Sequence, residues 1–212
     1  MQFARSLIAA WRLENTALDT SGNGRNGVVT GAAYAAGEQG RALDFAGGVT
    51  TDRVTVTHHA SLNPSAGLTI AARIYPRSPG ASTFARLLQK SVTTALANGY
   101  GCYCLANKLI LNVNNGGSVG FTTALAYNTW QRIGITCTAG GVVLAYLNGA
   151  GDGGGNTGAL AAITTVGDLT IGNRQNDLAR AWDGLIDELS IWNRVLIPAD
   201  MVRLTLGLSP VA

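Results

Sequence analysis

Short apolar runs separated by glycine-rich turns recur about every ten to fifteen residues along the chain, a spacing that is typical of all-β folds. These runs are 7–13, 54–56, 68–75, 86–90, 101–105, 108–113, 130–138, 142–147, 169–172 and 185–192. The turns between them include 21–24, 46–48, 114–117, 139–141 and 148–149. Because strands of this length cannot bury an apolar face alone, the pattern predicts an antiparallel β-sandwich of about twelve strands.

The composition agrees with this prediction and favours strands and turns over helices. The chain has 28 glycines, and its charged content is 13%, about half of the usual ~25%. Only one helix is expected, a short C-terminal one in which Pro198 begins the first turn and Ala199–Leu206 follow. The segment Gly149–Gly158 is expected to be a glycine-rich loop. No other biased segment divides the chain, so we predict one domain over residues 1–212.

Charge and hydropathy exclude two classes of partner. The net charge is +3, and the arginines are scattered singly along the chain. Without a basic run or a basic stripe with interleaved aromatics, nucleic acid is not an expected partner. No apolar stretch reaches the ~18 residues of a membrane span. The first residues lack the pattern of a secretory signal, so we expect synthesis in the cytosol without one.

The segment Trp182–Arg194 reads as a strand that carries acids. Strict alternation places Leu185, Asp187, Leu189 and Ile191 on one face, and Ile186, Glu188, Ser190 and Trp192 on the other. Asp187 is then buried among leucines and needs a partner. Asp187 and Glu188 point to opposite faces, which argues against a catalytic carboxylate pair. We therefore expect that the chain is not an enzyme.

Several segments, in this order along the chain, resemble one known family. Leu7–Leu13 is similar to its opening strand, Leu18–Gly27 (LDTSGNGRNG) to its turn, Gly40–Gly47 (GRALDFAG) to its G-x-A-L-x-F-x-G motif, and Leu68–Pro76 to its next core strand. The final segment, GLIDELSIWNR, closes the match. The family is the LamG-type (laminin G-like) jelly roll of the concanavalin A-like lectin/glucanase superfamily. The sequence departs from the family pattern at Arg73, where Trp is usual, and at Arg132, where His is common.

The resemblance implies a structural Ca²⁺ near the Leu18–Gly27 turn. The candidate ligands are Asp19, Asn23 and Gly24, joined by Asp187 from the closing strand, since Ca²⁺ prefers oxygen ligands. The alternative is that Asp19 caps the turn by accepting backbone N–H groups, while Asp187 pairs with an arginine or with loop amides.

Aromatic side chains are the candidates for stacking on a sugar. Trp192, on the more polar face of its strand, is the first candidate for a surface contact, followed by Tyr100 and Tyr127. In strands such residues more often pack in the interior. A glycan partner is therefore an expectation that rests on the fold of the family.

Two functions from different classes follow from these expectations. The first is a non-catalytic structural or attachment protein on a particle exterior, most simply a bacteriophage virion component such as a capsid decoration, fibre or tail protein. Its partners would be other virion proteins or copies of itself. The alternative is a secreted carbohydrate-binding module, and a glycoside hydrolase is the weakest candidate. The expected location is a virion or an extracellular surface.

Overall fold

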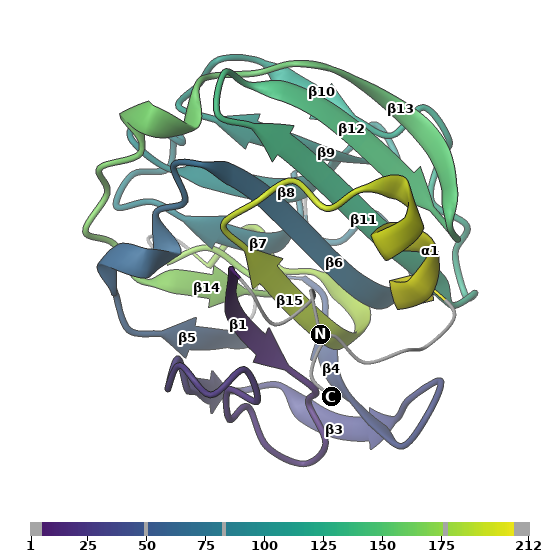
Figure 1. The fold of residues 1–212 in the computed structure, drawn as a ribbon. Helices are drawn as coiled ribbons and strands as arrows, with labels where there is room; N and C mark the ends of the chain where they lie inside the picture. Colours follow the sequence, from purple (N-terminus) through teal and green to yellow (C-terminus); the bar gives the residue numbers. More distant parts are fainter. Residues whose placement is uncertain (1–5, 49–50, 82–83, 176–177, 206–212) are drawn as a thin grey trace.

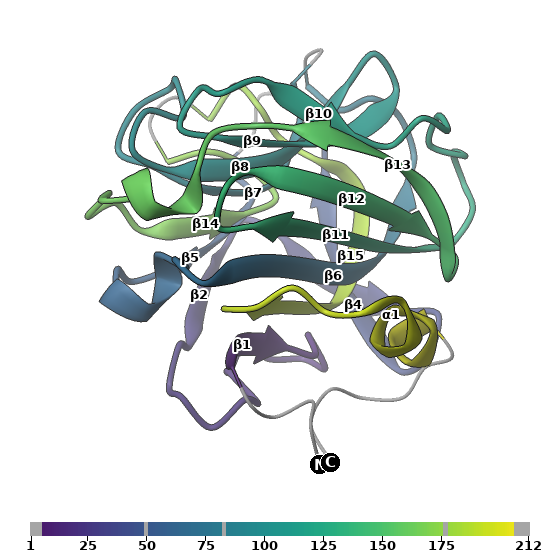
Figure 2. The ribbon, with the colours of Figure 1, turned by 45° about the horizontal axis from the view of Figure 1, so that its top comes forward.

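Two antiparallel sheets pack face to face in the computed structural model, which describes residues 6–48, 51–81, 84–175 and 178–205 (Figures 1 and 2). Sheet A has the order β13 (Ala150–Asn156), β12 (Val142–Leu147), β11 (Gln131–Thr138), β6 (Gly67–Pro76), β15 (Asp183–Trp192), β4 (Arg41–Ala46) and β3 (Ala33–Ala36), and β1 (Leu7–Trp11) also pairs with β15. Sheet B has the order β10 (Ser118–Gly120), β9 (Lys108–Val113), β8 (Tyr100–Leu105), β7 (Arg86–Lys90), β14 (Leu169–Ile171), β5 (Arg53–Val56) and β2 (Gly27–Thr30). The all-β sandwich prediction is confirmed. The described residues form 15 strands, more than the predicted number of about twelve.

One large core fills the space between the two sheets. It takes apolar side chains from nearly every strand, among them Trp11 of β1, Phe45 of β4 and Trp182 next to β15. Two short 3₁₀ helices, Ala60–Leu62 and Leu160–Ala162, each add a buried leucine. The alternation of inward and outward side chains along the strands therefore decides which residues can form a surface site.

The predicted glycine-rich loop is an edge strand, so this prediction was wrong. Residues Ala150–Asn156 pair with β12 along their length, because a backbone ladder needs no side chains. Gly153 has a φ of +145°, which favours glycine, and a Cβ there would lie 2.4 Å from the carbonyl oxygen of Gly120. The missing side chains let β13 approach the end of β10, so the two sheets meet at this edge (Figure 2).

The closing strand β15 contains a bulge that changes the predicted faces. Its pairing with β6 is regular up to Asp187 and resumes at Ser190, and Glu188 between them has a φ of +48°. The extra residue shifts the alternation by one position. As a result Ile186, Leu189 and Ile191 point into the core, whereas Asp187 lies beside Arg73 of β6. The prediction that Asp187 shares the apolar face was therefore wrong.

Helix α1 (Pro198–Thr205) confirms the predicted C-terminal helix and covers the outer face of sheet A (Figure 1); Leu206 lies outside the described residues. Met201 of the helix forms a small second core with Leu7, Ala10, Ala71, Tyr146, Trp192 and Leu196. No helix in the described ranges has the length and apolar character to cross a membrane.

Candidate functional site

The predicted calcium ligands have other partners in the structure. Asp19 accepts hydrogen bonds from the backbone N–H groups of Ala10 (3.0 Å), Ser21 (2.9 Å) and Arg25 (2.8 Å). Burial raises the pKa of Asp19, but these hydrogen bonds outweigh it and hold the pKa below its usual value. Donors that point at a carboxylate leave it little capacity for a cation. This geometry fits the capping alternative.

The other members of the calcium set do not complete it. The amide group of Asn23 donates to the carbonyl oxygens of Leu7 and Ile8. Gly24 could contribute only its carbonyl oxygen, and Asp187 accepts the N–H of Glu188 at 2.8 Å. In the part of the chain that the structure describes, no three His, Cys, Asp or Glu side chains gather into a metal site. The described side chains therefore supply no cluster of carboxylates for the expected ion, and the calcium site stays a prediction.

The predicted ligand-binding aromatics are interior residues. Tyr100 is fully buried in the main core and donates its hydroxyl to the carbonyl oxygen of Leu62 at 3.1 Å. Trp192 points to the outer face of sheet A, as expected, but α1 and Leu196 cover it completely. Tyr127 packs partly buried against the main core. The structure does not bring these three rings together, and neither Tyr100 nor Trp192 can contact a ligand from solvent.

A pocket of about 210 Å³ lies instead on the outer face of sheet B. Its floor comes from three neighbouring strands, where Arg86 of β7 faces Tyr103 of β8, and Asn112 of β9 lies nearby. Tyr103 points outward because Cys102 and Cys104, on either side of it, occupy the main core. We call this site the arginine pocket; its lining residues are Phe84, Arg86, Thr94, Ala95, Leu96, Tyr103, Asn112, Asn115, Arg174 and Arg180.

Two connecting segments form the walls of the arginine pocket. The segment between β7 and β8 folds back over the sheet, held by hydrogen bonds from Gln89 to the carbonyl oxygen of Thr93 and from Ser91 to that of Ala95. The segment between β14 and β15 carries Arg174 and Arg180, whose backbone N–H groups both donate to the side-chain oxygen of Asn173. The pocket therefore depends on residues that are far apart in the sequence.

Guanidinium and aromatic groups alternate inside the pocket. The Arg86 guanidinium lies 4.2 Å from the centre of the Tyr103 ring, and that of Arg180 lies 5.0 Å from the centre of the Phe84 ring. The two rings are themselves 5.9 Å apart. Such cation–π contacts partly offset the cost of burying a positive charge. They also hold the guanidinium groups in fixed positions.

The described lining of the pocket contains three arginines. The pKa of Arg86 is lowered to about 10, first by burial and also by the charges of Arg174 and Arg180. The pKa of Arg174 is lowered by burial and by Arg180. No aspartate or glutamate is among the described lining residues. A pocket with this lining is suited to bind an anionic group.

Sequence reasoning did not find this pocket. Its arginines look like isolated surface residues in the sequence, and they meet only when two connecting segments fold over sheet B. One signal was present: in the run Tyr100–Leu105, alternation separates Tyr103 from the two cysteines of the core. Tyr103 was therefore the aromatic residue of this strand that alternation left free to reach the surface.

The two departures from the family pattern occur together on the opposite sheet. Arg73 of β6 and Arg132 of β11 are cross-strand partners. Both form ion pairs with Glu38, at 3.3 Å and 3.0 Å. These arginines therefore belong to one charge cluster on sheet A, in which Asp187 is the neighbour of Arg73 on the other side.

Several solved structures share the fold of this chain. The chain is similar to domain 4 of AbnA, a GH43 extracellular arabinanase from Geobacillus stearothermophilus, in complex with arabinotriose, with a TM-score of 0.72 and 19% identity over 94% of this chain and 98% of that one. It is also similar to the binding domain of Paraclostridial Mosquitocidal Protein 1, with a TM-score of 0.75 and 15% identity over 97% of this chain and 53% of that one. A third match is botulinum neurotoxin type C, which depends on two ganglioside molecules to enter cells, with a TM-score of 0.70 and 17% identity over 98% of this chain and 52% of that one. The chain thus spans about half the length of the two toxin chains, and identities this low show a shared fold alone.

Sequence comparison identifies the family. No relative by sequence was found among curated proteins. A family model described as the concanavalin A-like lectin/glucanases superfamily matches residues 47–201, which is most of the chain. The matched region includes β5 to β15, with strands of both sheets, and every described residue that lines the arginine pocket. The chain therefore belongs to the concanavalin A-like lectin/glucanases superfamily.

Proposed function

We propose that this chain is a non-catalytic carbohydrate-binding domain whose binding site is the arginine pocket. The observation that carries the proposal is a concave site in which guanidinium groups lie against aromatic rings. Sugar sites combine such ring faces with a few polar groups that fix orientation. The arabinanase domain in complex with arabinotriose and the ganglioside-dependent toxin add support from proteins of the same fold.

The lining of the pocket supports binding in preference to hydrolysis. Glycosidases need two carboxyl groups about 5 to 10 Å apart across the scissile bond, and the described lining residues supply neither. On sheet A, Asp183 is paired with Arg77 at 3.0 Å, and Glu188 with Arg12 at 3.3 Å. These acids belong to structural ion pairs.

A glycan array tests the proposal, with a blocked variant as the comparison. Ala95 is exposed at the rim of the pocket, so Ala95→Trp fills the mouth without disturbing the core. Ala199→Trp places the same side chain at an exposed position of α1, on the other sheet. We expect the unmodified chain and Ala199→Trp to bind the same saccharides, and Ala95→Trp to bind them at least about tenfold more weakly. Absence of saccharide binding, or equal binding by the two variants, would overturn the proposal.

The predicted place of the chain on a virion exterior stays a prediction. A domain that binds saccharides would serve a particle for attachment to a cell surface, so the two ideas are compatible. Mass spectrometry of purified particles from the source of the chain tests the location. Finding the chain only outside particles would contradict the virion prediction and leave carbohydrate binding unaffected.

A further inference from the structure

Arg86 is a buried cation whose partners are all neutral. Its side chain is 5% exposed. It donates from Nε to the Gln89 carboxamide oxygen at 2.7 Å and from a terminal nitrogen to the carbonyl oxygen of Phe84 at 3.3 Å, and the Tyr103 ring covers one face. No carboxylate of the described residues forms an ion pair with it. A buried charge without a counter-ion is costly, so this arrangement is suited to receive an anion.

Two further arginines line the pocket. Arg174 and Arg180 lie beside Arg86, and the charges of both lower the pKa of Arg86. A planar carboxylate matches the two parallel N–H groups of a guanidinium better than a spherical anion does.

Asn112, on the floor of the pocket, has a side-chain oxygen that lacks a hydrogen-bond donor among the described residues. The side-chain oxygen of Asn112 is buried and has no hydrogen-bond partner among the described residues, and the residue as a whole is 9% exposed. Its amide nitrogen and the Tyr103 hydroxyl both reach Ser118, at 3.5 Å and 2.7 Å. This oxygen can therefore accept a hydrogen bond from a donor other than the described residues, and a sugar hydroxyl is such a donor.

From these two groups we infer that the arginine pocket selects a saccharide that carries a carboxylate, with the carboxylate at Arg86 and a hydroxyl donating to Asn112. The pocket volume of about 210 Å³ is below the ~300 Å³ at which sites for drug-sized ligands begin, so it holds one acidic sugar unit of a longer chain. This inference rests on the proposed function and narrows it to uronic or sialic acid sugars.

Calorimetric titration with matched pairs of ligands tests the inference. Oligogalacturonate is compared with its methyl ester, and sialyllactose with lactose, so that each pair differs in one kind of charge. We expect at least one acidic ligand to bind about 10- to 100-fold more tightly than its neutral partner, because hydrogen bonds to charged groups are the stronger ones. The pair that shows the difference identifies the source of the carboxylate.

Two arginine variants assign the effect to the pocket. Arg86→Lys keeps the charge but loses the guanidinium fork, and we expect it to remove most of the preference for the acidic ligand. Because that residue is buried, Arg180→Gln at the rim is a second test that places less demand on folding. Arg12→Ala, on the exposed surface of sheet A, is the matched control and should keep the preference.

The outcomes separate the inference from the proposed function. Equal binding of acidic and neutral ligands, blocked by Ala95→Trp, would overturn the inference and leave carbohydrate binding intact. A preference for lactose sulfate over both carboxylated ligands would also overturn it. Absence of binding to every saccharide would overturn both.

Discussion

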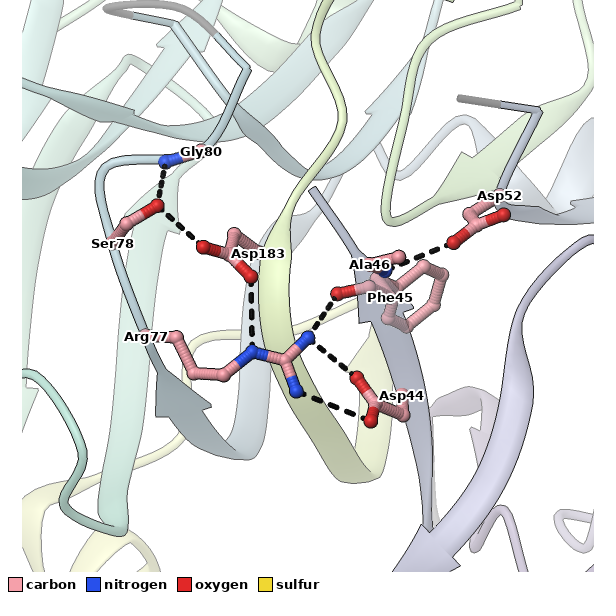
Figure 3. A network of polar contacts seen from close by, with 8 residues as sticks. All are labelled: Asp44, Phe45, Ala46, Asp52, Arg77, Ser78, Gly80 and Asp183. Carbon is pink, nitrogen blue, oxygen red and sulfur yellow. Dashed lines mark hydrogen bonds and ion pairs between the residues drawn. The ribbon is translucent and has the colours of Figure 1, made fainter. Parts of the chain in front are cut away.

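Arg77 and Arg86 lie at opposite ends of the segment that joins β6 to β7, and their charges are compensated in different ways. Arg77 donates two hydrogen bonds to Asp44, at 2.7 Å and 3.1 Å, and one to Asp183 at 3.0 Å (Figure 3). Its pKa is raised, first by the hydrogen bond to Asp44. Arg86 contacts only neutral groups of the described chain, and its pKa is lowered by burial.

The difference separates an arginine that holds the fold from one that is available to a ligand. Arg77 connects three strands of sheet A, because its partners belong to β4 and β15 and it follows β6 directly (Figure 3). Its donors are used within the chain. Arg86 is more deeply buried than Arg77 but has no anion within the described chain. Burial without compensation is the property that points to a binding site.

Asp187 is the acidic counterpart of Arg86 on the opposite sheet. It is 1% exposed, and one of its carboxylate oxygens has no hydrogen-bond partner among the described residues. Burial, followed by the charge of Glu188, raises its pKa to about 7. An acid can relieve its burial by taking up a proton near neutral pH, whereas Arg86 keeps its charge at a pKa of about 10. Only the arginine therefore requires an external partner at neutral pH.

The largest expected effect is the pH dependence of stability that Asp187 causes. Its folded-state pKa is raised, so the folded chain binds this proton more tightly than the unfolded chain does. The contribution of Asp187 is favourable at low pH and is lost as the pH rises from about 4 to about 7. We expect the free energy of unfolding of Asp187→Asn, relative to the unmodified chain, to rise over this range by at most about 4 kcal/mol. Denaturant unfolding of both proteins at several pH values measures it.

Asp19→Asn is the control, because the stability contribution of Asp19 depends on pH in the opposite direction. The pKa of Asp19 is lowered in the folded state, so its contribution is present above its usual pKa and is lost as the pH falls. We expect Asp19→Asn to be less stable than the unmodified chain at neutral pH, with a gap that closes in acid. A constant difference between Asp187→Asn and the unmodified chain at all pH values would show that Asp187 is compensated like Arg77.

The next effect is the loss of the Arg77 network. Arg77→Ala leaves Asp44 and Asp183 without their shared cation, and both are only partly exposed. We expect the free energy of unfolding to fall by about 2–3 kcal/mol, between the values for surface and buried pairs. Arg12→Ala breaks an exposed pair with Glu188 and should cost less than about 1 kcal/mol. Equal losses in the two variants would remove the distinction between a structural arginine and a surface one.

The sequence predicted the sandwich and its C-terminal helix well, because strand spacing and the Pro198 signal are local. Two predictions about individual strands were wrong, and each error has a physical cause. The bulge at Glu188 reverses the faces of the part of β15 that precedes it, yet a non-glycine residue with positive φ leaves no mark in the sequence. The glycines of β13 favour a loop by composition, and only the neighbouring strand makes them a strand. The arginine pocket was not predictable, since its groups come from separate segments and its signal is a missing counter-ion.

The smallest expected effect on stability, and the one that decides the comparison, is that of Arg86→Met. Removing the buried charge relieves its desolvation cost, and methionine suits the neighbouring cluster of Leu96, Tyr103 and Ile110. The loss of the hydrogen bond from Arg86 to Gln89 opposes this gain in stability. We expect the gain and the loss to cancel, so that the free energy of unfolding changes by less than about 1 kcal/mol in denaturant unfolding. The same substitution should nevertheless remove binding of a carboxylated saccharide. If Arg86→Met instead costs as much as Arg77→Ala, Arg86 holds the fold as Arg77 does, and its burial then gives no reason to place an anion in the pocket.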